Sequence, residues 1–341
     1  MKIERQPIET LPWESMDEYG DRVFSQRLPW LEFIVETQGG EIVIAHLSDE
    51  GKTVGYFTGI LFKKFGFKIM GSPFPGWNTP YLGFNLLPCI SRKRAVAALI
   101  PFIFKELGCI HLELADPYLC PDDVQEFEFK SKITHTYVSD LTLTEDALFA
   151  KMKSSCRGSI RKAEKIGTRI EEASPIGFSE EYFRHLTDVF AKQNLKPTHG
   201  QERIEKLLKH LHPTGNLLLL RARDAEGRSI ATGIYPGFNK LSYFLGNGSL
   251  RQFQKANPNE IMHWYAMRYW KNRGVENHYW GGGGAYKEKY GGAQISTMSF
   301  SLSKYKIILA TRLVAEKLYR YPRSVKRMLH LRNIANTSTD N

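Results

Sequence analysis

The sequence predicts an α+β fold in which one unit, a mixed and mainly antiparallel sheet flanked by helices, occurs twice. The main observation is an internal repeat: three short strands, a helix and a closing strand follow one another in each half of the chain. Composition agrees, because 341 residues with 42% hydrophobic and 24% charged residues are typical of a globular protein with two domains.

The first copy of the unit is marked by β-branched and aromatic runs that alternate with turn residues. Asp and Gly in the turns supply the backbone conformations that join antiparallel strands, and Gly108 suits the position just past a helix end. We expect three strands, a helix and a closing strand at Glu41–His46, Thr53–Leu61, Phe67–Met70, Arg92–Leu107 and Cys109–Leu114.

The second copy repeats these signals in the same order. Gly246–Gly248 is expected to end its third strand, and Gly274 to end its helix. The strands and the helix are expected at Asn216–Ala222, Ser229–Pro236, Leu241–Leu245, Asn259–Asn272 and Val275–Trp280.

A strand at Tyr137–Leu143 and a helix after Thr144 connect the two copies. Thr144 is a suitable N-cap, and Glu145 and Asp146 follow it where the helix dipole favours acids. Apolar residues then recur at helical spacing, which predicts one apolar face made of Phe149, Met152, Cys156, Ile160 and Ala163. Two more helices are expected at Glu180–Asn194 and Gln201–His212.

Two segments resemble the Fem-type transferases and the wider Fem-like acetyltransferase (GNAT) superfamily. Ser154–Glu172 is similar to the segment that opens the second domain of that family, and Ala256–Gly292 is similar to its Pro-Asn helix and closing strand-loop. The matching residues are Arg157, Ile160, Arg161, Lys162, Ala163, Lys165, Gly167, Pro258, Asn259, Trp264, Gly274, Tyr286, Lys287, Tyr290, Gly291 and Gly292. The resemblance implies tandem GNAT-like domains at residues 1–140 and 141–310. Residues 311–341 are expected to form a basic helix, which packs on the first domain, and a frayed tail.

One departure from the acetyltransferase pattern concerns the donor. Coenzyme A-binding members carry a glycine-rich turn whose bare N–H groups hold the pyrophosphate at a helix N-terminus. Here the same place reads Gln254–Asn259, which has no glycine, and Pro258 removes one N–H donor. This favours a donor other than ordinary coenzyme A without excluding it.

Lys287 is the leading candidate for a catalytic side chain. It follows Gly281–Gly284 at the end of a predicted strand, where backbone can approach a ligand closely. An ammonium there would stabilise the negative charge that develops when an amine attacks an ester or thioester. The resemblance implies the same position, near the reacting ester. Tyr286 is a second catalytic candidate and Tyr290 a binding candidate, although tyrosines of a strand-loop also serve as packing residues.

Other residues are expected to bind substrate. Arg157, Arg161 and Lys165 have the chemistry to hold phosphate groups, or they form the solvated face of a helix. Trp77 and Tyr81, in the long loop Gly71–Phe84, suit stacking on a sugar or base, or packing between domains. Asn259 belongs to the matched helix motif.

Together these features predict an acyl- or aminoacyl-transferase that forms an amide on a cell-envelope or polysaccharide precursor. The donor is expected to be an acyl-CoA or an aminoacyl-tRNA, with no tightly bound cofactor and no metal, and the acceptor a nucleotide- or lipid-linked sugar or peptide. The alternative is a degenerate tandem module that binds RNA or an anionic membrane surface, which the net charge of +11 also suits. Scattered cysteines, no apolar run of membrane-spanning length and no signal-peptide pattern favour a cytoplasmic location. The oligomeric state stays open.

Overall fold

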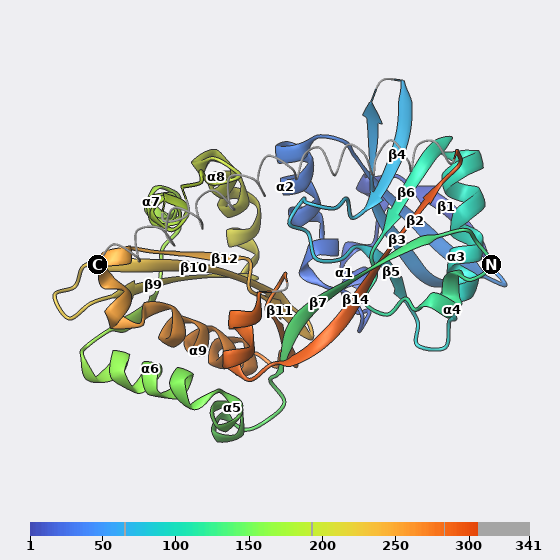
Figure 1. The fold of residues 1–341 in the computed structure, drawn as a ribbon. Coiled ribbons are helices and arrows are strands. Elements are labelled where there is room, and N and C mark those ends of the chain that lie inside the picture. The colour runs from blue at the N-terminus through green and yellow to red at the C-terminus, as the bar shows by residue number, and fades with distance from the viewer. Residues whose placement is uncertain (65, 192–193, 283, 306–341) are drawn as a thin grey trace, which may run out of the picture.

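The computed structural model describes residues 1–64, 66–191, 194–282 and 284–305. These residues form two lobes joined through one continuous sheet of fourteen strands (Figure 1). The strands run in the order β1-β2-β3-β4-β6-β14-β7-β13-β11-β10-β9-β8, with β5 paired to β3 and β12 paired to β10. Two pairs, β4 with β6 and β11 with β13, are parallel and the others are antiparallel. The predicted α+β fold with mixed sheets and flanking helices is therefore confirmed.

The first lobe is built from the N-terminal part of the chain. Its strands are β1 Lys2–Gln6, β2 Glu41–Asp49, β3 Lys52–Lys64, β4 Phe67–Ser72, β5 Gly83–Leu86, β6 Cys109–Leu114 and β7 Lys130–Asp140. Its helices are α1 Trp13–Asp17, α2 Leu28–Gln38, α3 Arg92–Pro101 and α4 Pro121–Val124, with a π-type turn at Phe102–Glu106 and 3-10 turns at Ile8–Thr10 and Phe24–Gln26.

The second lobe repeats the series. Its strands are β8 Arg169–Glu172, β9 Leu217–Arg223, β10 Ser229–Phe238, β11 Leu241–Tyr243, β12 Gly246–Ser249, β13 Asn277–Tyr279 and β14 Ala293–Ser303. Its helices are α5 Glu145–Lys151, α6 Ser154–Lys165, α7 Phe178–Ala191, α8 Gln201–Leu211 and α9 Pro258–Lys271, with 3-10 turns at His212–Thr214, Arg251–Ala256 and Ala285–Tyr290.

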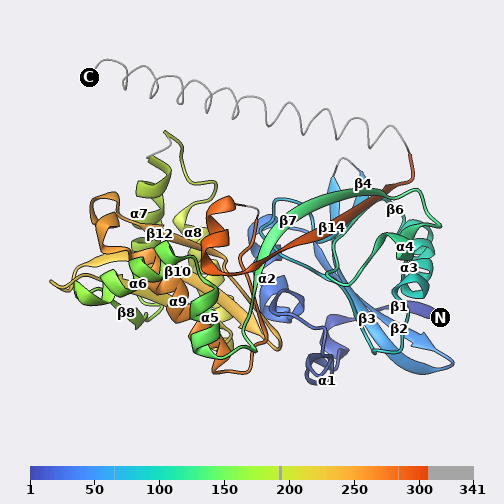
Figure 2. The same ribbon diagram turned by 60° about the horizontal axis from the view of Figure 1, so that its bottom comes forward.

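Each lobe receives one long strand from the other half of the chain. In the first lobe β6 pairs with β14, and in the second lobe β13 pairs with β7. β7 and β14 also pair with each other from Lys130 opposite Ser301 to Val138 opposite Ala293. Figures 1 and 2 both show this two-stranded ribbon crossing from one lobe to the other. The two halves therefore complete each other's sheets.

Alternating burial explains how the sheet supports helices on both faces. In β2, Ile42 and Ile44 pack with α2 and α8 in a core that both lobes share, while Val43 faces α3 on the opposite side. In β9, Leu219 joins the shared core and Leu218 packs under α9. This alternation follows from the two-residue period of a strand, and the shared core joins the lobes.

The structure corrects two predictions of local structure. The stretch expected as one helix after Thr144 is divided into α5 and α6, because Met152 and Lys153 adopt extended backbone angles. Lys153 N–H donates instead to the carbonyl of Lys289, which ties the break to the closing loop. Gly246–Gly248, expected as the end of a strand, belongs to β12 and pairs with β10. The predicted C-terminal helix at 311–341 lies outside the described residues.

Candidate active site

A cavity of about 800 Å³ lies between the two lobes, against the β7–β14 ribbon. The first lobe contributes the loop after β4 and the end of β6, and the second lobe contributes the ends of β11 and β13. The lining includes Phe74, Thr79, Tyr81, Glu113, Lys130, Lys132, Thr134, Thr136, Tyr243, Tyr279, Gly281, Gly282, Thr297, Ser299 and Ser301. This volume is within the range of small-molecule sites.

One wall of the cavity is a ladder of hydroxyl groups. Thr134 lies opposite Thr297, and their hydroxyls are 2.8 Å apart. The two-residue period of a strand places further polar residues of β7 and β14 on the same face: Lys130, Lys132, Thr136, Ser299 and Ser301. Aromatic rings supply other parts of the lining: Phe74, Tyr81, Tyr243 and Tyr279. Hydroxyls and aromatic faces together suit a ligand that has both polar edges and apolar surfaces.

Lys287 lies directly behind one end of this cavity. It belongs to the 3-10 turn Ala285–Tyr290 and is only 7% exposed. Its Nζ donates to the carbonyl of Trp280 at 2.5 Å and to that of Gly282, a lining residue, at 2.6 Å. Burial lowers the pKa of Lys287 to about 8, because the charged form loses solvation. The Lys287 side chain does not line the cavity itself, but its hydrogen bond to Gly282 connects it directly to the cavity wall.

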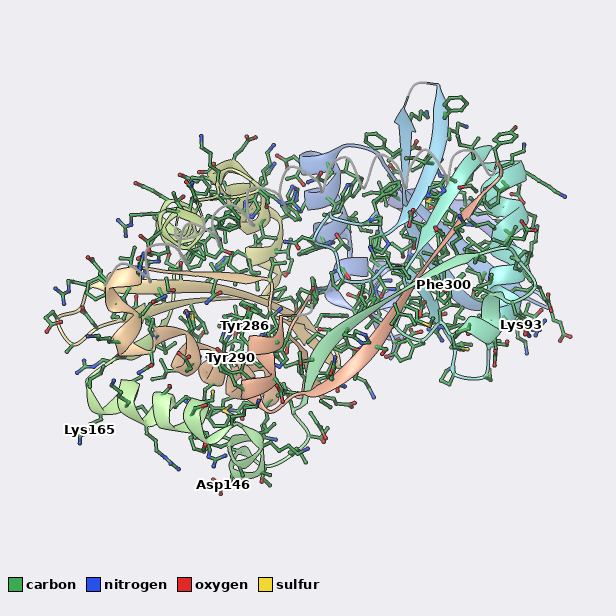
Figure 3. The ribbon with its side chains drawn as sticks, in the orientation of Figure 1. Lys93, Asp146, Lys165, Tyr286, Tyr290 and Phe300 are labelled. Carbon is green, nitrogen blue, oxygen red and sulfur yellow. The ribbon has the colours of Figure 1, made fainter. Side chains whose placement is uncertain are left out.

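The two tyrosines beside Lys287 occupy different environments. Tyr290 is 2% exposed and stacks on Trp280 with ring centroids 4.4 Å apart, so it is part of the core. Tyr286 is exposed, and its ring centroid lies 5.8 Å from Lys287 Nζ. Figure 3 shows both rings on the short turn next to β7. Neither lines the cavity.

The space beyond the parallel pair β11–β13 is filled by buried rings. His263 packs edge-on against Phe244 at 4.7 Å and Trp280 at 5.1 Å. Its Nδ1 is 2.8 Å from the hydroxyl of Tyr235, and His278 Nδ1 is 2.8 Å from Ser242 Oγ. Burial holds the pKa of His263 well below its usual value and lowers that of His278 to about 3. Both imidazoles are therefore neutral structural groups at physiological pH.

Asn259 lies at the start of α9, outside the cavity lining. Its side chain accepts from Asn247 Nδ2 at 2.8 Å and donates to Ser249 Oγ at 3.4 Å, both on β12. Asn257, just before the helix, takes the left-handed conformation, with φ of 50°. The motif thus anchors α9 to the edge of β12.

Arg157, Arg161 and Lys165 lie on α6, and none of them lines the cavity. Arg157 donates to the carbonyls of Ala150 and Met152, which are left without helical partners where α5 ends. Arg161 lies over the ring of Phe149 at 5.3 Å. Lys165 is exposed near the end of α6 that is remote from Tyr286 in Figure 3. Their contact with phosphate stays a prediction.

The aromatic loop of the first lobe holds two residues that were predicted to bind substrate, and the structure places them in different environments. Tyr81 lines the cavity, is 6% exposed and meets Tyr279 edge-to-face at 5.9 Å. Trp77 packs on Phe74 at 4.7 Å instead, and its carbonyl accepts from Arg203 at 3.1 Å. The same loop therefore serves the cavity through Tyr81 and the contact between lobes through Trp77.

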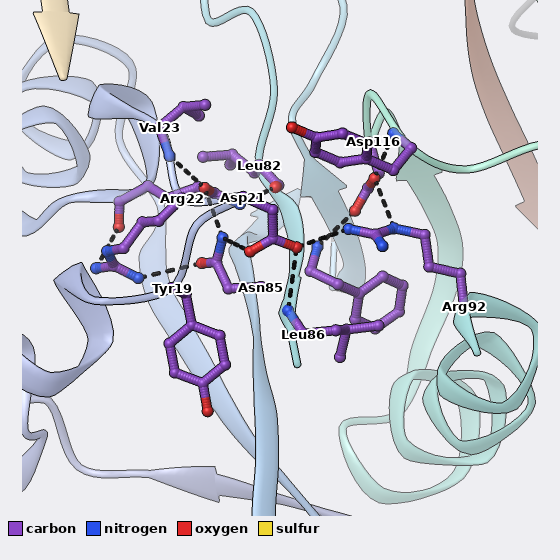
Figure 4. A network of polar contacts seen from close by, with 12 residues as sticks. Tyr19, Asp21, Arg22, Val23, Leu82, Asn85, Leu86, Arg92 and Asp116 are labelled. Carbon is purple, nitrogen blue, oxygen red and sulfur yellow. Dashed lines mark hydrogen bonds and ion pairs between the residues drawn. The ribbon is translucent and has the colours of Figure 1, made fainter. Parts of the chain in front are cut away.

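A buried polar network fixes the first-lobe side of the cavity (Figure 4). Asp116, just after β6, accepts from the Phe84 N–H at 2.9 Å and pairs with Arg92 at 3.1 Å. Arg92 also pairs with Asp21 at 2.8 Å, and Asp21 accepts from Leu86 N–H. Strand β5, which pairs with β3 as β12 pairs with β10 in the second lobe, is thereby tied to the end of β6.

Several lining residues were missed by sequence reasoning. Glu113, Tyr243 and Tyr279 lie on strands that were predicted as core elements. The hydroxyl ladder lies on β14 and on the part of β7 before Tyr137, and neither was predicted as a strand. The alternating hydroxyls of Thr297, Ser299 and Ser301 are a signal of a strand with one polar face, and they were available in the sequence.

Among the described residues, no His, Cys, Asp and Glu side chains group as metal ligands, and no helix has the length and apolarity to cross a membrane.

A family model described as "Acetyltransferase (GNAT) domain" matches residues 150–290, the segment that holds α6, α9 and Lys287. No curated protein sequence matches the chain significantly. Residues 150–290 thus match an acetyltransferase domain, and the protein is an acyltransferase.

Solved structures extend the likeness to both lobes. A structure of FemX has a TM-score of 0.74 at 14% identity and covers 90% of this chain and 99% of its own. L-PGS from Bacillus licheniformis has a TM-score of 0.53 at 13% identity, covering 85% and 96%. The C-terminal domain of a putative lysylphosphatidylglycerol synthetase from Agrobacterium fabrum has a TM-score of 0.52 at 11% identity, covering 84% and 91%. The fold is therefore Fem-like along nearly the whole chain.

Proposed function

Because the chain carries an acetyltransferase (GNAT) domain within a Fem-like fold, we propose that it forms an amide by transferring an acyl or aminoacyl group to an amine of a cell-envelope or polysaccharide precursor. The observation that carries this proposal is the buried Lys287 ammonium at the wall of the cavity between the lobes. Transfer would take place at the Gly281–Gly282 end of that cavity.

The chemistry requires a neutral amine and stabilisation of the oxyanion that forms when the amine attacks the donor carbonyl. Two backbone carbonyls already fix the Lys287 ammonium, which leaves one of its three N–H donors for another acceptor. A cation held in this way loses little entropy when it meets a developing negative charge. Gly282 leaves open space beside it, since no heavy atom lies within 4 Å of its Cβ position.

The donor is proposed to be an aminoacyl-tRNA or an acyl-CoA. Two features support the first. The glycine-rich pyrophosphate turn is replaced by the sequence before α9, and aromatic rings fill the space beyond β11 and β13. The name of one structural neighbour, a lysylphosphatidylglycerol synthetase, also describes an aminoacyl group joined to a lipid headgroup.

The acceptor is proposed to bind in the main body of the cavity. Its hydroxyl ladder and the rings of Tyr81 and Tyr279 suit a nucleotide- or lipid-linked sugar or peptide. A volume of about 800 Å³ accommodates a ligand much larger than a single amino acid.

The experiment compares coenzyme A thioesters, aminoacyl-tRNA mimics and amine-bearing nucleotide sugars by thermal shift at fixed ionic strength, followed by mass spectrometry of the mixtures. Specific ligands raise the unfolding temperature by mass action. We expect one donor class to stabilise the protein and to modify an amine acceptor. Salt-dependent shifts with every polyanion and no product would contradict the proposal and favour a module that binds RNA or anionic membranes.

A further inference from the structure

One edge of β7 is open where the strand borders the cavity. On one side β7 pairs with β14 along most of its length, and on the other side it pairs with β13 only from Val138 onward. Gly281, just beyond β13, accepts a hydrogen bond from the Thr136 hydroxyl and then, with φ of 66°, turns the chain away. Among the described residues, none pairs with this side of β7 from Ser131 to His135, a segment that we call the open edge.

The backbone groups of alternate residues face the open edge. The carbonyl of Tyr137 accepts from the N–H of Trp280 at 3.0 Å, so the polar groups of Tyr137 point to the side of β13. Successive residues of a strand direct their N–H and C=O groups to opposite sides. Ser131, Ile133 and His135 therefore point the same way as Tyr137, and the open edge presents three donors and three acceptors.

The open edge belongs to the wall of the cavity and leads to the proposed point of transfer. Ser131 and His135 line the cavity, and so do Gly281 and Gly282 at one end of it. The carbonyl of Gly282 accepts from Lys287. Five extended residues span about 17 Å. An extended segment of this length laid along the open edge would therefore have one end beside the lysine.

We propose that the open edge binds an extended peptide segment of the acceptor as an added strand, with the reacting amine at the Gly281–Gly282 end. Such a strand would satisfy the alternating donors and acceptors of the edge. It would also continue the line of β13, which already occupies the neighbouring place along β7. The inference rests on the proposed function in taking the cavity as the acceptor site, and adds how the acceptor is held there.

Two other occupants fit the open edge less well. A sugar lacks donors and acceptors that repeat at the spacing of alternate strand residues, about 7 Å. A second copy of the chain, paired edge to edge, would bring the exposed Lys130 and Lys132 of both copies into one small area. Like charges on edge strands oppose such pairing.

The test uses a pool of capped pentapeptides that have a central lysine and random flanking residues. The pool is passed over the immobilised full chain at fixed ionic strength, and mass spectrometry identifies the retained peptides. We expect retention at least tenfold above that of a pool methylated at every backbone nitrogen, because methylation removes the N–H donors and keeps the side chains. The most strongly retained peptide should slow hydrogen exchange at the amides of Ser131, Ile133 and His135 at least tenfold.

Ile133→Pro blocks the open edge and spares the pairing with β14. Proline is tolerated on an edge strand where its missing N–H would face away from the sheet. Ile133 is 57% exposed, so the change removes little packing. We expect this variant to keep its fold, as judged by its unfolding temperature, and to lose retention of the peptides. Ile133→Ala keeps the N–H, is the matched control, and should retain them like the wild type.

Equal retention of the two pools, or retention of neither, would overturn the proposal, and so would wild-type retention by folded Ile133→Pro. Protection of the three amides that depends on protein concentration and not on peptide would place a second copy on the open edge and overturn it as well. If Ile133→Pro does not fold, the exchange measurement decides alone.

The binding test needs no donor, so it separates this inference from the proposed function. Failure to detect acyl transfer with any donor would count against the proposed function and not against the open edge. Transfer to an amine-bearing nucleotide sugar, by a protein that retains no peptide, would leave the proposed function standing and refute the added strand.

Discussion

At the scale of single residues, the proposed chemistry depends on a lysine that is both buried and charged. The carbonyls of Trp280 and Gly282 compensate for part of its lost solvation. The solvation that these two hydrogen bonds do not replace lowers the pKa of Lys287 to about 8. Below that pH the side chain is an ammonium, the form that stabilises an oxyanion, and above it the side chain is a neutral amine.

The contribution of Lys287 to the rate of transfer should therefore fall as the pH rises through about 8. The folded-state pKa of Lys287 is lowered by burial, so its charge is lost well before that of an exposed lysine. In Lys287→Arg the guanidinium stays charged to a much higher pH, and whatever activity this variant keeps should not decline near pH 8. Initial rates from pH 6 to 10 measure the profile. Because the acceptor amine also becomes neutral over this range, the decisive quantity is the ratio of the wild-type rate to the Lys287→Arg rate. A ratio that stays level or rises through pH 9 would refute the role of the ammonium.

The sequence pointed to Lys287 and Tyr81, because a glycine-flanked lysine and an aromatic loop are local signals. It pointed equally to Arg157, whose guanidinium donates hydrogen bonds to the carbonyls at the end of α5. A basic residue on a helix looks the same in the sequence whether it binds a ligand or caps a neighbouring helix. Glu113 was missed because its place in the cavity wall arises only when β14 pairs with β6.

At the scale of elements, the closing loop is fitted against the break between α5 and α6. Gly291 has φ of 79°, and a Cβ there would lie 2.8 Å from the backbone carbon of Lys151. Backbone contacts of this kind cannot be relieved by a side-chain movement. The glycine of the family motif is thus required by the packing of α5.

Gly291→Ala should lower the free energy of unfolding by about 1–3 kcal/mol, because it combines a strained backbone with a steric clash. Gly282→Ala is the matched control, since it has an unstrained φ and open space at its Cβ position. Urea unfolding of the two variants measures the difference. Equal stabilities would show that the loop adjusts freely.

The β7–β14 ribbon offers a second element-scale prediction. Thr297→Trp places a large ring on the face that lines the cavity, and should reduce acceptor binding and transfer by at least tenfold. Ser296→Trp adds the same ring one residue earlier, on the opposite face of β14, and should leave transfer near the wild-type rate. Product formation by mass spectrometry compares them. Equal activity in both variants would exclude the cavity as the acceptor site.

The sequence predicted most strands to within a few residues, since alternation and turns are local. It did not predict how β14 pairs with β6 and β7, because partners far apart in the sequence leave no local pattern. The alternating hydroxyls of β14 did mark it as a strand, and that signal was missed. The sequence also predicted α5 and α6 as one helix. Their apolar residues keep helical spacing through Met152, although the backbone at Met152 is extended.

At the scale of the whole molecule, the exchange of β7 and β14 makes the two lobes interdependent. Without β14, one edge of β6 in the first lobe has no neighbouring strand. Phe300 of β14 is also buried in the core of that lobe. The shared core between α2 and α8 adds to this dependence. Duplicated units joined in this way should unfold as one cooperative system.

A fragment of residues 1–140 should consequently fail to fold alone. It would expose the open edge of β6 and the site that Phe300 fills, and unpaired edges of this kind promote aggregation. Circular dichroism and the dispersion of amide NMR signals test this, with the full chain as control. A monomeric fragment with a cooperative thermal transition would show that the first lobe is independent.

The most direct test of the account is transfer by Lys287→Met under the conditions in which the wild type forms product. The account predicts a loss of about 10²–10³-fold in the rate of the chemical step, with the thermal shifts caused by donor and acceptor retained. A variant that turns over at the wild-type rate while folded would contradict the central claim that the buried ammonium at the cavity wall stabilises the reacting carbonyl.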